Sequence, residues 1–156
     1  DIKATLADET VGDQAKAAIA IIYETGLRLQ ELLDLRAKDI DPKTSSIRVL
    51  GKGNKERTVY YGELTRKYGR KWRGERHTQR GVRHLVYEAL SKHSKAPQLS
   101  PHALRHTYAS ELLNNGMPIE AISKLMGHVH LETTQVYAKL ANKTTQNLYL
   151  NFKPTI

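Results

Sequence analysis

The sequence contains no cysteine. Disulfide bridges, a thiolate nucleophile and a cysteine-based zinc site are therefore excluded, and the composition fits a reducing cytosol. A membrane helix needs roughly 18 uninterrupted apolar residues, and the longest apolar run, residues 17–23, is far shorter. Acidic residues stand where a signal peptide would be basic and apolar, at Asp1, Asp8, Glu9 and Asp13. We therefore expect a cytoplasmic protein with no membrane partner.

Two signatures of cofactor chemistry are also missing. No glycine-rich phosphate loop runs into Lys-Ser or Lys-Thr, and no cluster of acidic residues is suited to holding magnesium. We expect the chemistry of this chain to need neither a nucleotide nor a metal cofactor.

The composition favours one folded domain with a basic surface. The chain has 156 residues, of which 39% are hydrophobic, enough for a single substantial core across residues 1–156. Lys and Arg outnumber Asp and Glu by 25 to 16, which gives a formal charge of +9. Such a surface suits a polyanion, and nucleic acid is the commonest one.

Apolar spacing and capping residues predict a mostly helical fold with a small antiparallel sheet, an α+β class. A β-hairpin is expected from strands at 46–50 and 57–61, which flank a glycine-bearing tip at 51–56. The expected helices cover residues 15–24 with Thr10 as N-cap and Gly26 as stop, 29–35, Thr78 to about 92, Ser100 to 114, 118 to Gly127, and about 132–141; residues 39–42 read as a turn and 71–73 as a third short strand.

His102 and Arg105 are the first candidate site residues. They lie three apart in the first turns of a predicted helix, so their side chains are neighbours on its surface. A guanidinium, an imidazole and the partial positive charge of a helix N-terminus together form a receptor for a phosphodiester. Taken alone, the pair also fits an ordinary solvated helix surface.

Four further residues are ambiguous when taken singly. His128 follows Gly127 and can be a simple helix cap, and Tyr137 has no claim over the other tyrosines. Arg28 can project from the junction of two helices, held by Glu31 three residues on, or form an exposed ion pair of little value. Lys52 stands at the hairpin tip, where a charged residue also protects a sheet edge.

Their order along the chain is more specific. Five motifs follow one another: TGLRLQEL at residues 25–32, GKGNKER at 51–57, HALRHT at 102–107, LMGH at 125–128 and TTQVY at 133–137. In this order they resemble the tyrosine recombinase (phage integrase) family, over residues 5–140. The resemblance implies the catalytic-domain fold of that family. It also implies that a separate N-terminal DNA-binding domain accompanies this one in the full protein.

The resemblance implies a role for each candidate. Arg28 and Arg105 are the two active-site arginines, and their charged forks suit the phosphorane oxygens. His128 is a further donor, Tyr137 the nucleophile that forms a 3′-phosphotyrosine, His102 the general base and Lys52 the general acid. The implied function is site-specific DNA recombination or integration by a homotetramer on two duplexes, in a bacterial or phage setting, without metal or ATP.

One segment departs from the family pattern. Between the hairpin and His102 the family carries another helix, for which residues 61–69 are too few. We expect that helix to be abbreviated or its segment rearranged. The strongly basic stretch that follows, residues 66–83, is expected to contact the DNA backbone, and the predicted DNA-binding residues are Lys55, Arg57, Lys71, Arg73, Arg76, Arg80 and Arg83.

Three other functions stay open at this point. A type IB-like topoisomerase uses related chemistry without partner strands. A non-enzymatic helix-turn-helix domain would use the helices around Gly116. A metal site can be built on His102 and His106 with His128 or His130, although an ordered acid is lacking.

Overall fold

The computed structural model describes residues 1–127, 145–146 and 148–154, in two compact units, Asp1–Tyr108 and Ala109–Ile156. The predicted mixture of helices and one small antiparallel sheet is confirmed. In the described residues the elements are α1 (Ile2–Ala7), α2 (Asp13–Thr25), α3 (Leu29–Asp34), η1 (Ala37–Asp39), β1 (Ile40–Asp41), β2 (Ser46–Leu50), η2 (Lys52–Asn54), β3 (Glu56–Tyr60), α4 (Glu63–Tyr68), η3 (Gly69–Lys71), η4 (Gly74–Arg76), α5 (Gln79–Ser91), α6 (Pro101–Asn114) and α7 (Ile119–Met126), where η marks a 3-10 turn.

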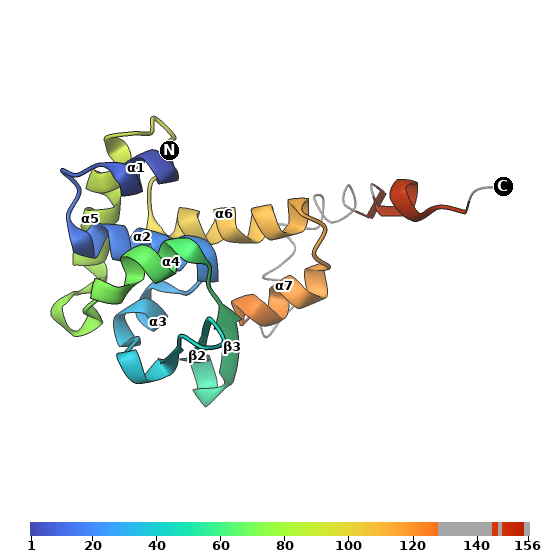
Figure 1. Ribbon diagram of the computed structural model, residues 1–156, viewed down its shortest axis with the longest axis horizontal. Helices are drawn as coiled ribbons and strands as arrows, with labels where there is room; N and C mark the ends of the chain where they lie inside the picture. Colours follow the sequence, from blue (N-terminus) through green and yellow to red (C-terminus); the bar gives the residue numbers. More distant parts are fainter. Residues whose placement is uncertain (128–144, 147, 155–156) are drawn as a thin grey trace. The chain divides into compact units, whose positions relative to one another are not determined.

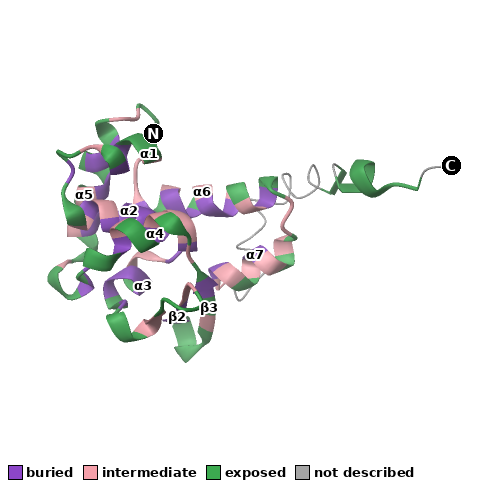
Figure 2. Ribbon diagram, viewed as in Figure 1, coloured by how far each residue is buried: buried purple, intermediate pink, exposed green. Residues whose placement is uncertain are grey.

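Helix α2 is the centre of the first unit. Residues 17–22 are all buried, because this stretch is apolar on every side and must be surrounded by other elements. Helices α1, α4 and α5 pack against it, as Figures 1 and 2 show. The helix ends at Gly26, which has the left-handed φ of 67° predicted for its stop.

The start of α2 differs from the prediction. The helix begins at Asp13 with Gly12 as N-cap, so Thr10 as a cap was wrong. The N–H and hydroxyl of Thr10 instead donate to the Asp8 carboxylate, at 2.8 and 2.6 Å. An aspartate two residues away competes well for these donors, because its charged side chain forms a local turn.

The sheet has three antiparallel strands in the order β1-β2-β3. In the β2–β3 hairpin Ile47 pairs with Val59 and Val49 with Arg57, and the three aliphatic side chains are buried on one face. The third strand is β1, within the segment predicted as a turn. The predicted strand at 71–73 was wrong, since that segment is a 3-10 turn followed by a buried tryptophan.

The segment after the hairpin, which was expected to be too short for the family's helix, forms the six-residue helix α4. The carboxylate of Glu24, from the end of α2, accepts from the backbone N–H groups of Gly62, Leu64 and Thr65 at 2.8–3.0 Å. It thereby satisfies donors that a helix N-terminus leaves open.

Two predicted N-caps are confirmed. The Thr78 hydroxyl accepts from Gly81 N–H at 3.0 Å, and the Ser100 hydroxyl from Ala103 N–H at 3.1 Å. In the second unit α6 closes before Gly116, whose φ is 98°, and α7 ends at Gly127 with a φ of 70°. The predicted helix at 132–141 lies outside the described residues.

Candidate active site

Both predicted arginines are tied to one short turn, residues 26–28. Arg28 is the N-cap residue of α3, directly after the left-handed Gly26. Arg105 approaches from α6, and its Nη1 donates to the backbone carbonyl of Gly26. Only 8% of Arg105 is exposed, so its guanidinium is held by protein rather than by water. The turn therefore carries Arg28 and contacts Arg105, two residues that are 77 positions apart in the sequence.

Tyr108, one turn after Arg105, fixes this arrangement from the other side. Its buried ring packs on Gly26 so closely that a Cβ there would lie 2.3 Å from the ring carbon Cδ1. Burial raises the pKa of the Tyr108 hydroxyl, and the charges of Arg57 and Arg105 oppose this only in part. Tyr108 is therefore a packing residue of this turn.

Glu31 is a buried carboxylate that contacts Arg28. Its Oε1 accepts from the backbone N–H of Arg28 at 2.8 Å, and its Oε2 lies 3.7 Å from the Arg28 guanidinium. Burial disfavours its charge, but hydrogen bonds from Arg57 and Arg28, together with their charges, hold the Glu31 pKa below its ordinary value. The predicted contact between Glu31 and Arg28 is present, and it is joined by a second arginine.

That second arginine is Arg57 of β3. Its two terminal nitrogens donate to the two oxygens of Glu31, at 2.5 and 2.8 Å. Of the side chains, 11% of Arg57 and 6% of Glu31 are exposed. The structure therefore places Arg57, predicted to contact DNA, in a buried ion pair. Because Arg57 precedes the buried Val59 by two residues, strand alternation already placed it on the inner face.

Lys52 lies at the exposed hairpin tip, in the short turn η2. The tip is closed by a hydrogen bond from Gly51 N–H to the Lys55 carbonyl at 2.8 Å, and Lys55 is also exposed. His102 is exposed in the first turn of α6, three residues before Arg105. His128 and Tyr137 lie outside the described residues.

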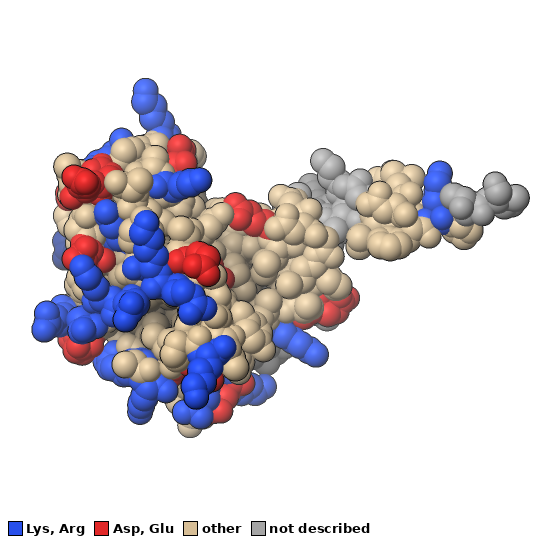
Figure 3. Space-filling view, in the orientation of Figure 1, with Lys and Arg blue, Asp and Glu red and all other residues tan. Residues whose placement is uncertain are grey.

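The five predicted DNA-binding residues of the stretch 66–83 are on the surface. Figure 3 shows Lys and Arg side chains gathered over α4 and the turns that follow it. Of this set, Lys71 is 3.1 Å from Asp13, Arg73 donates to the Trp72 carbonyl at 2.9 Å, and Arg83 donates to Gln79 at 3.2 Å; Lys71, Arg73, Arg76, Arg80 and Arg83 are all exposed.

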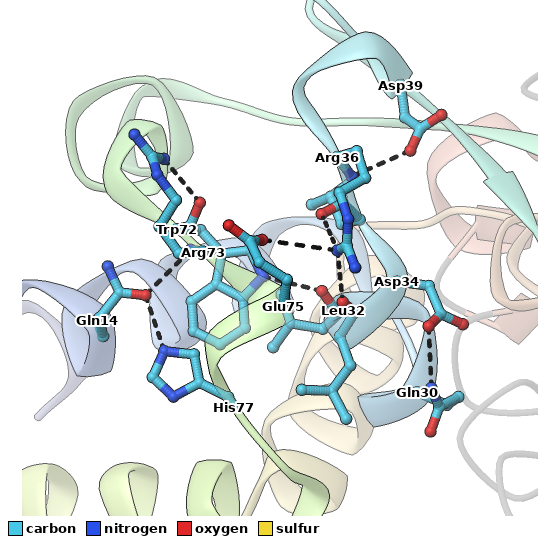
Figure 4. A network of polar contacts seen from close by, with 12 residues as sticks. Gln14, Gln30, Leu32, Asp34, Arg36, Asp39, Trp72, Arg73, Glu75 and His77 are labelled. Atoms are coloured by element: carbon cyan, nitrogen blue, oxygen red, sulfur yellow. Dashed lines mark hydrogen bonds and ion pairs between the residues drawn. The ribbon is translucent and has the colours of Figure 1, made fainter.

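A polar network that sequence reasoning missed holds this basic segment in place (Figure 4). Gln14 of α2 donates to the Lys71 carbonyl at 2.5 Å and accepts from the Arg73 N–H at 3.0 Å. His77 lies 2.9 Å from the same Gln14 oxygen and stacks on Trp72 with ring centroids 4.8 Å apart. The Trp72 indole donates to the Leu32 carbonyl in α3 at 2.8 Å. The partners lie 40 to 63 residues apart, so no local pattern indicates them.

In the part of the chain that the structure describes, no three His, Asp or Glu side chains are grouped as metal ligands, and no helix is long and apolar enough to span a membrane. His128 and His130, which the alternative metal site would use, lie outside that part.

Comparison with known proteins decides the family. A sequence profile described as "Phage integrase family" matches residues 2–144. The chain belongs to the phage integrase family. Among curated family members, the tyrosine recombinase XerC of Staphylococcus epidermidis is 34% identical over 94% of this chain, and that of Staphylococcus haemolyticus is 35% identical over the same share. The chain spans 56% of the length of each.

Solved structures of phage integrase relatives have the same fold. The crystal structure of XerA recombinase matches 99% of this chain and 64% of its own, with 26% identity and a TM-score of 0.77. XerH site-specific recombinase bound to its difH substrate matches 87% of this chain and 48% of its own, with 22% identity and a TM-score of 0.69. The latter likeness shows the fold alone.

Proposed function

We propose that this chain is the catalytic domain of a site-specific recombinase that cleaves and rejoins double-stranded DNA. The observation that carries the proposal is the turn at residues 26–28, which carries Arg28 and accepts a hydrogen bond from the buried Arg105. Two rigid guanidinium forks anchored at the same turn suit the charge that develops on the oxygens of a phosphate under attack. Family membership supplies the reaction class.

In the proposed reaction the Tyr137 oxygen attacks phosphorus and gives its proton to His102. A 3′-phosphotyrosine bond forms as the bond to the 5′ oxygen breaks, and Lys52 protonates that oxygen. Arg28, Arg105 and His128 stabilise the charge of the phosphorane. Attack by a 5′ hydroxyl then reverses every step, so the bond energy is conserved and neither ATP nor a metal is consumed.

The proposed partner is a DNA recombination site, acted on in a bacterial or phage-infected cytoplasm. We assign backbone contacts to the exposed cations Lys55, Lys71, Arg73, Arg76, Arg80 and Arg83, which would position the chain more than select a sequence. Arg57 is left out of this set because its guanidinium is engaged by Glu31.

We further propose a homotetramer on two duplexes. The helical segment at residues 148–152 presents apolar side chains to solvent, with 52% of Leu150 and 82% of Phe152 exposed. Apolar residues this exposed favour burial against another surface. A neighbouring copy of the chain is the proposed partner of this segment.

The test is covalent capture on DNA. The chain is incubated with a library of duplexes that carry a nick beside a randomised sequence, and adducts that survive SDS are isolated and sequenced. We expect an adduct with the wild type and with Tyr87→Phe, an exposed control, but none with Tyr137→Phe. EDTA should leave the yield unchanged.

The other outcomes identify the alternatives. Binding without any adduct indicates a non-enzymatic DNA-binding domain and overturns the proposal. Adducts combined with relaxation of a supercoiled plasmid by the unassembled chain indicate a topoisomerase. An adduct formed by Tyr137→Phe removes Tyr137 as the nucleophile.

A further inference from the structure

We propose that Arg57 is a positioning residue for Lys52. Its ion pair with Glu31 holds the hairpin against α3 and thereby sets Lys52 where it can protonate the leaving 5′ oxygen. This inference rests on the proposed function, because the acid role of Lys52 belongs to it. It assigns to the third arginine of the site a task other than contact with DNA.

The ion pair between Arg57 and Glu31 has a fixed geometry. Arg57 and Glu31 meet through two parallel hydrogen bonds, of 2.5 and 2.8 Å, which fix both the distance and the plane of the two groups. Both side chains are mostly withdrawn from water. A buried charge that loses its partner is costly, so the pair strongly favours one position of β3 relative to α3.

The hairpin tip begins directly beside the ion pair. Gly51 lies on the ion pair: a Cβ there would stand 3.3 Å from Glu31 Oε2 and 3.4 Å from Arg57 Nη1. The same glycine closes the tip through its hydrogen bond to the Lys55 carbonyl. Lys52 is the next residue. Any shift of the ion pair therefore reaches the Lys52 backbone through a single residue.

Glu31 also contacts Arg28, the N-cap residue of α3. The Glu31 oxygen that accepts from Arg57 Nη2 also accepts from the Arg28 backbone N–H. Glu31 thus links the strand that leads back to Lys52 with the start of the helix that carries Arg28. The same carboxylate, that of Glu31, therefore positions both the proposed general acid and a proposed phosphate-binding arginine.

A competing explanation is that Arg57 acts through Glu31 on Arg28, and so on the charge of the phosphorane. The chemistry of the leaving group distinguishes these two explanations. An alkoxide must be protonated as it departs, whereas a thiolate, with a pKa near 8.5, leaves without help. If sulfur replaces the bridging 5′ oxygen, loss of the acid should cease to matter, while loss of phosphate stabilisation should persist.

The experiment measures single-turnover cleavage on the oxygen and sulfur forms of a duplex recovered by covalent capture. The variants are Arg57→Met, Lys52→Met and Arg28→Lys, with Arg48→Met as the matched control. Arg48 is an exposed arginine of the neighbouring strand, whose backbone partner is Thr58. Thermal unfolding identifies any variant that fails to fold. In that case Arg57→Lys, which keeps the charge but loses the two-pronged contact, replaces Arg57→Met.

We expect Arg57→Met and Lys52→Met each to slow cleavage of the oxygen substrate by roughly 100-fold. On the sulfur substrate Arg57→Met and Lys52→Met should each cleave as fast as the wild type, whereas Arg28→Lys should stay slow on both substrates. On the oxygen substrate the double variant Lys52→Met/Arg57→Met should be no slower than Lys52→Met alone. Arg48→Met should be unaffected.

Two outcomes overturn the proposal. One is an Arg57→Met loss that persists with sulfur while Lys52→Met recovers, which assigns Arg57 to phosphate stabilisation. The other is a Lys52→Met loss that persists with sulfur, which removes the acid role itself. In both cases wild-type cleavage leaves the assignment as a DNA-cleaving recombinase standing, and in the second case another group must supply the proton. A wild type that forms no adduct on either substrate refutes the function.

Discussion

At the scale of single residues, three arginines of this site have three different surroundings. Arg105 is buried on a backbone carbonyl, Arg57 is matched by a carboxylate, and Arg28 shares that carboxylate while more of its side chain faces water. Arg28 is therefore the most exposed of the three, Arg57 is committed to the Glu31 carboxylate, and Arg105 is anchored at the Gly26 carbonyl.

Replacing Glu31 by glutamine should be strongly destabilising. Arg57 would keep its buried charge without the carboxylate that matches it, and breaking such a pair costs about 3–5 kcal/mol. Urea unfolding measures the change. Glu63→Gln is the control, since the Glu63 side chain is 91% exposed and its pair with Arg66 should be worth less than about 1 kcal/mol. Equal losses in the two variants would contradict this account of the site.

The pH dependence of stability should follow the same carboxylate. The pKa of Glu31 is lowered in the folded chain, so its stabilising contribution is complete above the unfolded value of about 4.3. It is lost as the pH falls through the lower, folded value. Free energies of unfolding measured from pH 7 downward should therefore drop in acid, and less steeply in Glu31→Gln. Parallel curves for the two proteins would show that Glu31 does not titrate as stated.

Alanine at Gly26 should damage both fold and site. A Cβ at this position meets the Tyr108 ring and also strains the left-handed backbone, and each effect costs about 1–3 kcal/mol. We expect a loss of at least about 2 kcal/mol in the free energy of unfolding. The control is Gly12→Ala, where a Cβ meets nothing within 4 Å and the change should be within about 1 kcal/mol. A Gly26→Ala chain as stable as the control would refute the close packing.

At the scale of elements, the basic segment depends on helices that are remote in sequence. Trp72 reaches α3, and Gln14 of α2 holds the backbone on both sides of Trp72. Between α4 and α5 the segment contains only two short 3-10 turns. Some of its backbone N–H and C=O groups are therefore paired by side chains, where a strand would pair them with a neighbouring strand.

Trp72→Phe should loosen this segment. Phenylalanine keeps most of the apolar contact but cannot donate to the Leu32 carbonyl, and it fills less volume. A loss of about 1–3 kcal/mol is expected in urea unfolding. Tyr87→Phe, at an exposed site on α5, should change stability by less than about 0.5 kcal/mol. If Trp72→Phe behaves like that control, the indole contact contributes nothing measurable.

The elements show which features a sequence can predict. The Thr78 and Ser100 caps and the hairpin were predictable because donor and acceptor lie within a few residues, or because alternation marks the strands. The strand expected at 71–73 was wrong. Trp72 is buried there because its indole donates to the Leu32 carbonyl, 40 residues away, and not because the segment pairs in a sheet. Thr10 is not the cap because its N–H and hydroxyl donate to the Asp8 carboxylate two residues away.

The candidate site follows the same division. Arg28, Lys52, His102 and Arg105 could be selected because each stands in a recognisable motif. Their spatial relation could not, since it depends on contacts such as Arg105 with Gly26, which lie 79 residues apart. The charge of Arg57 alone suggests contact with DNA, whereas its inward register on β3 places it against Glu31.

At the scale of the whole molecule, the excess of cations should control DNA affinity. Each phosphate interaction that a substitution removes should reduce the slope of log affinity against log salt by about 0.9. Arg80→Gln combined with Arg83→Gln should therefore reduce the slope by about 2 on a duplex of arbitrary sequence, measured by fluorescence anisotropy. Lys38→Gln, an exposed lysine outside the predicted set, should leave it unchanged. Equal slopes for all variants would remove α5 from the DNA interface.

The hydrogen bond between Arg105 and Gly26 also has a consequence for timing. A ribosome that adds about 5–20 residues per second makes the turn at 26–28 roughly 4–16 s before it reaches Arg105. Glu31 and Arg57, 26 residues apart, are both synthesised well before that point. Arg105 is therefore the last of the three arginines to join. Under the proposed reaction, a nascent or prematurely terminated chain that lacks α6 has only one of the two arginines assigned to the phosphate and would not cleave DNA.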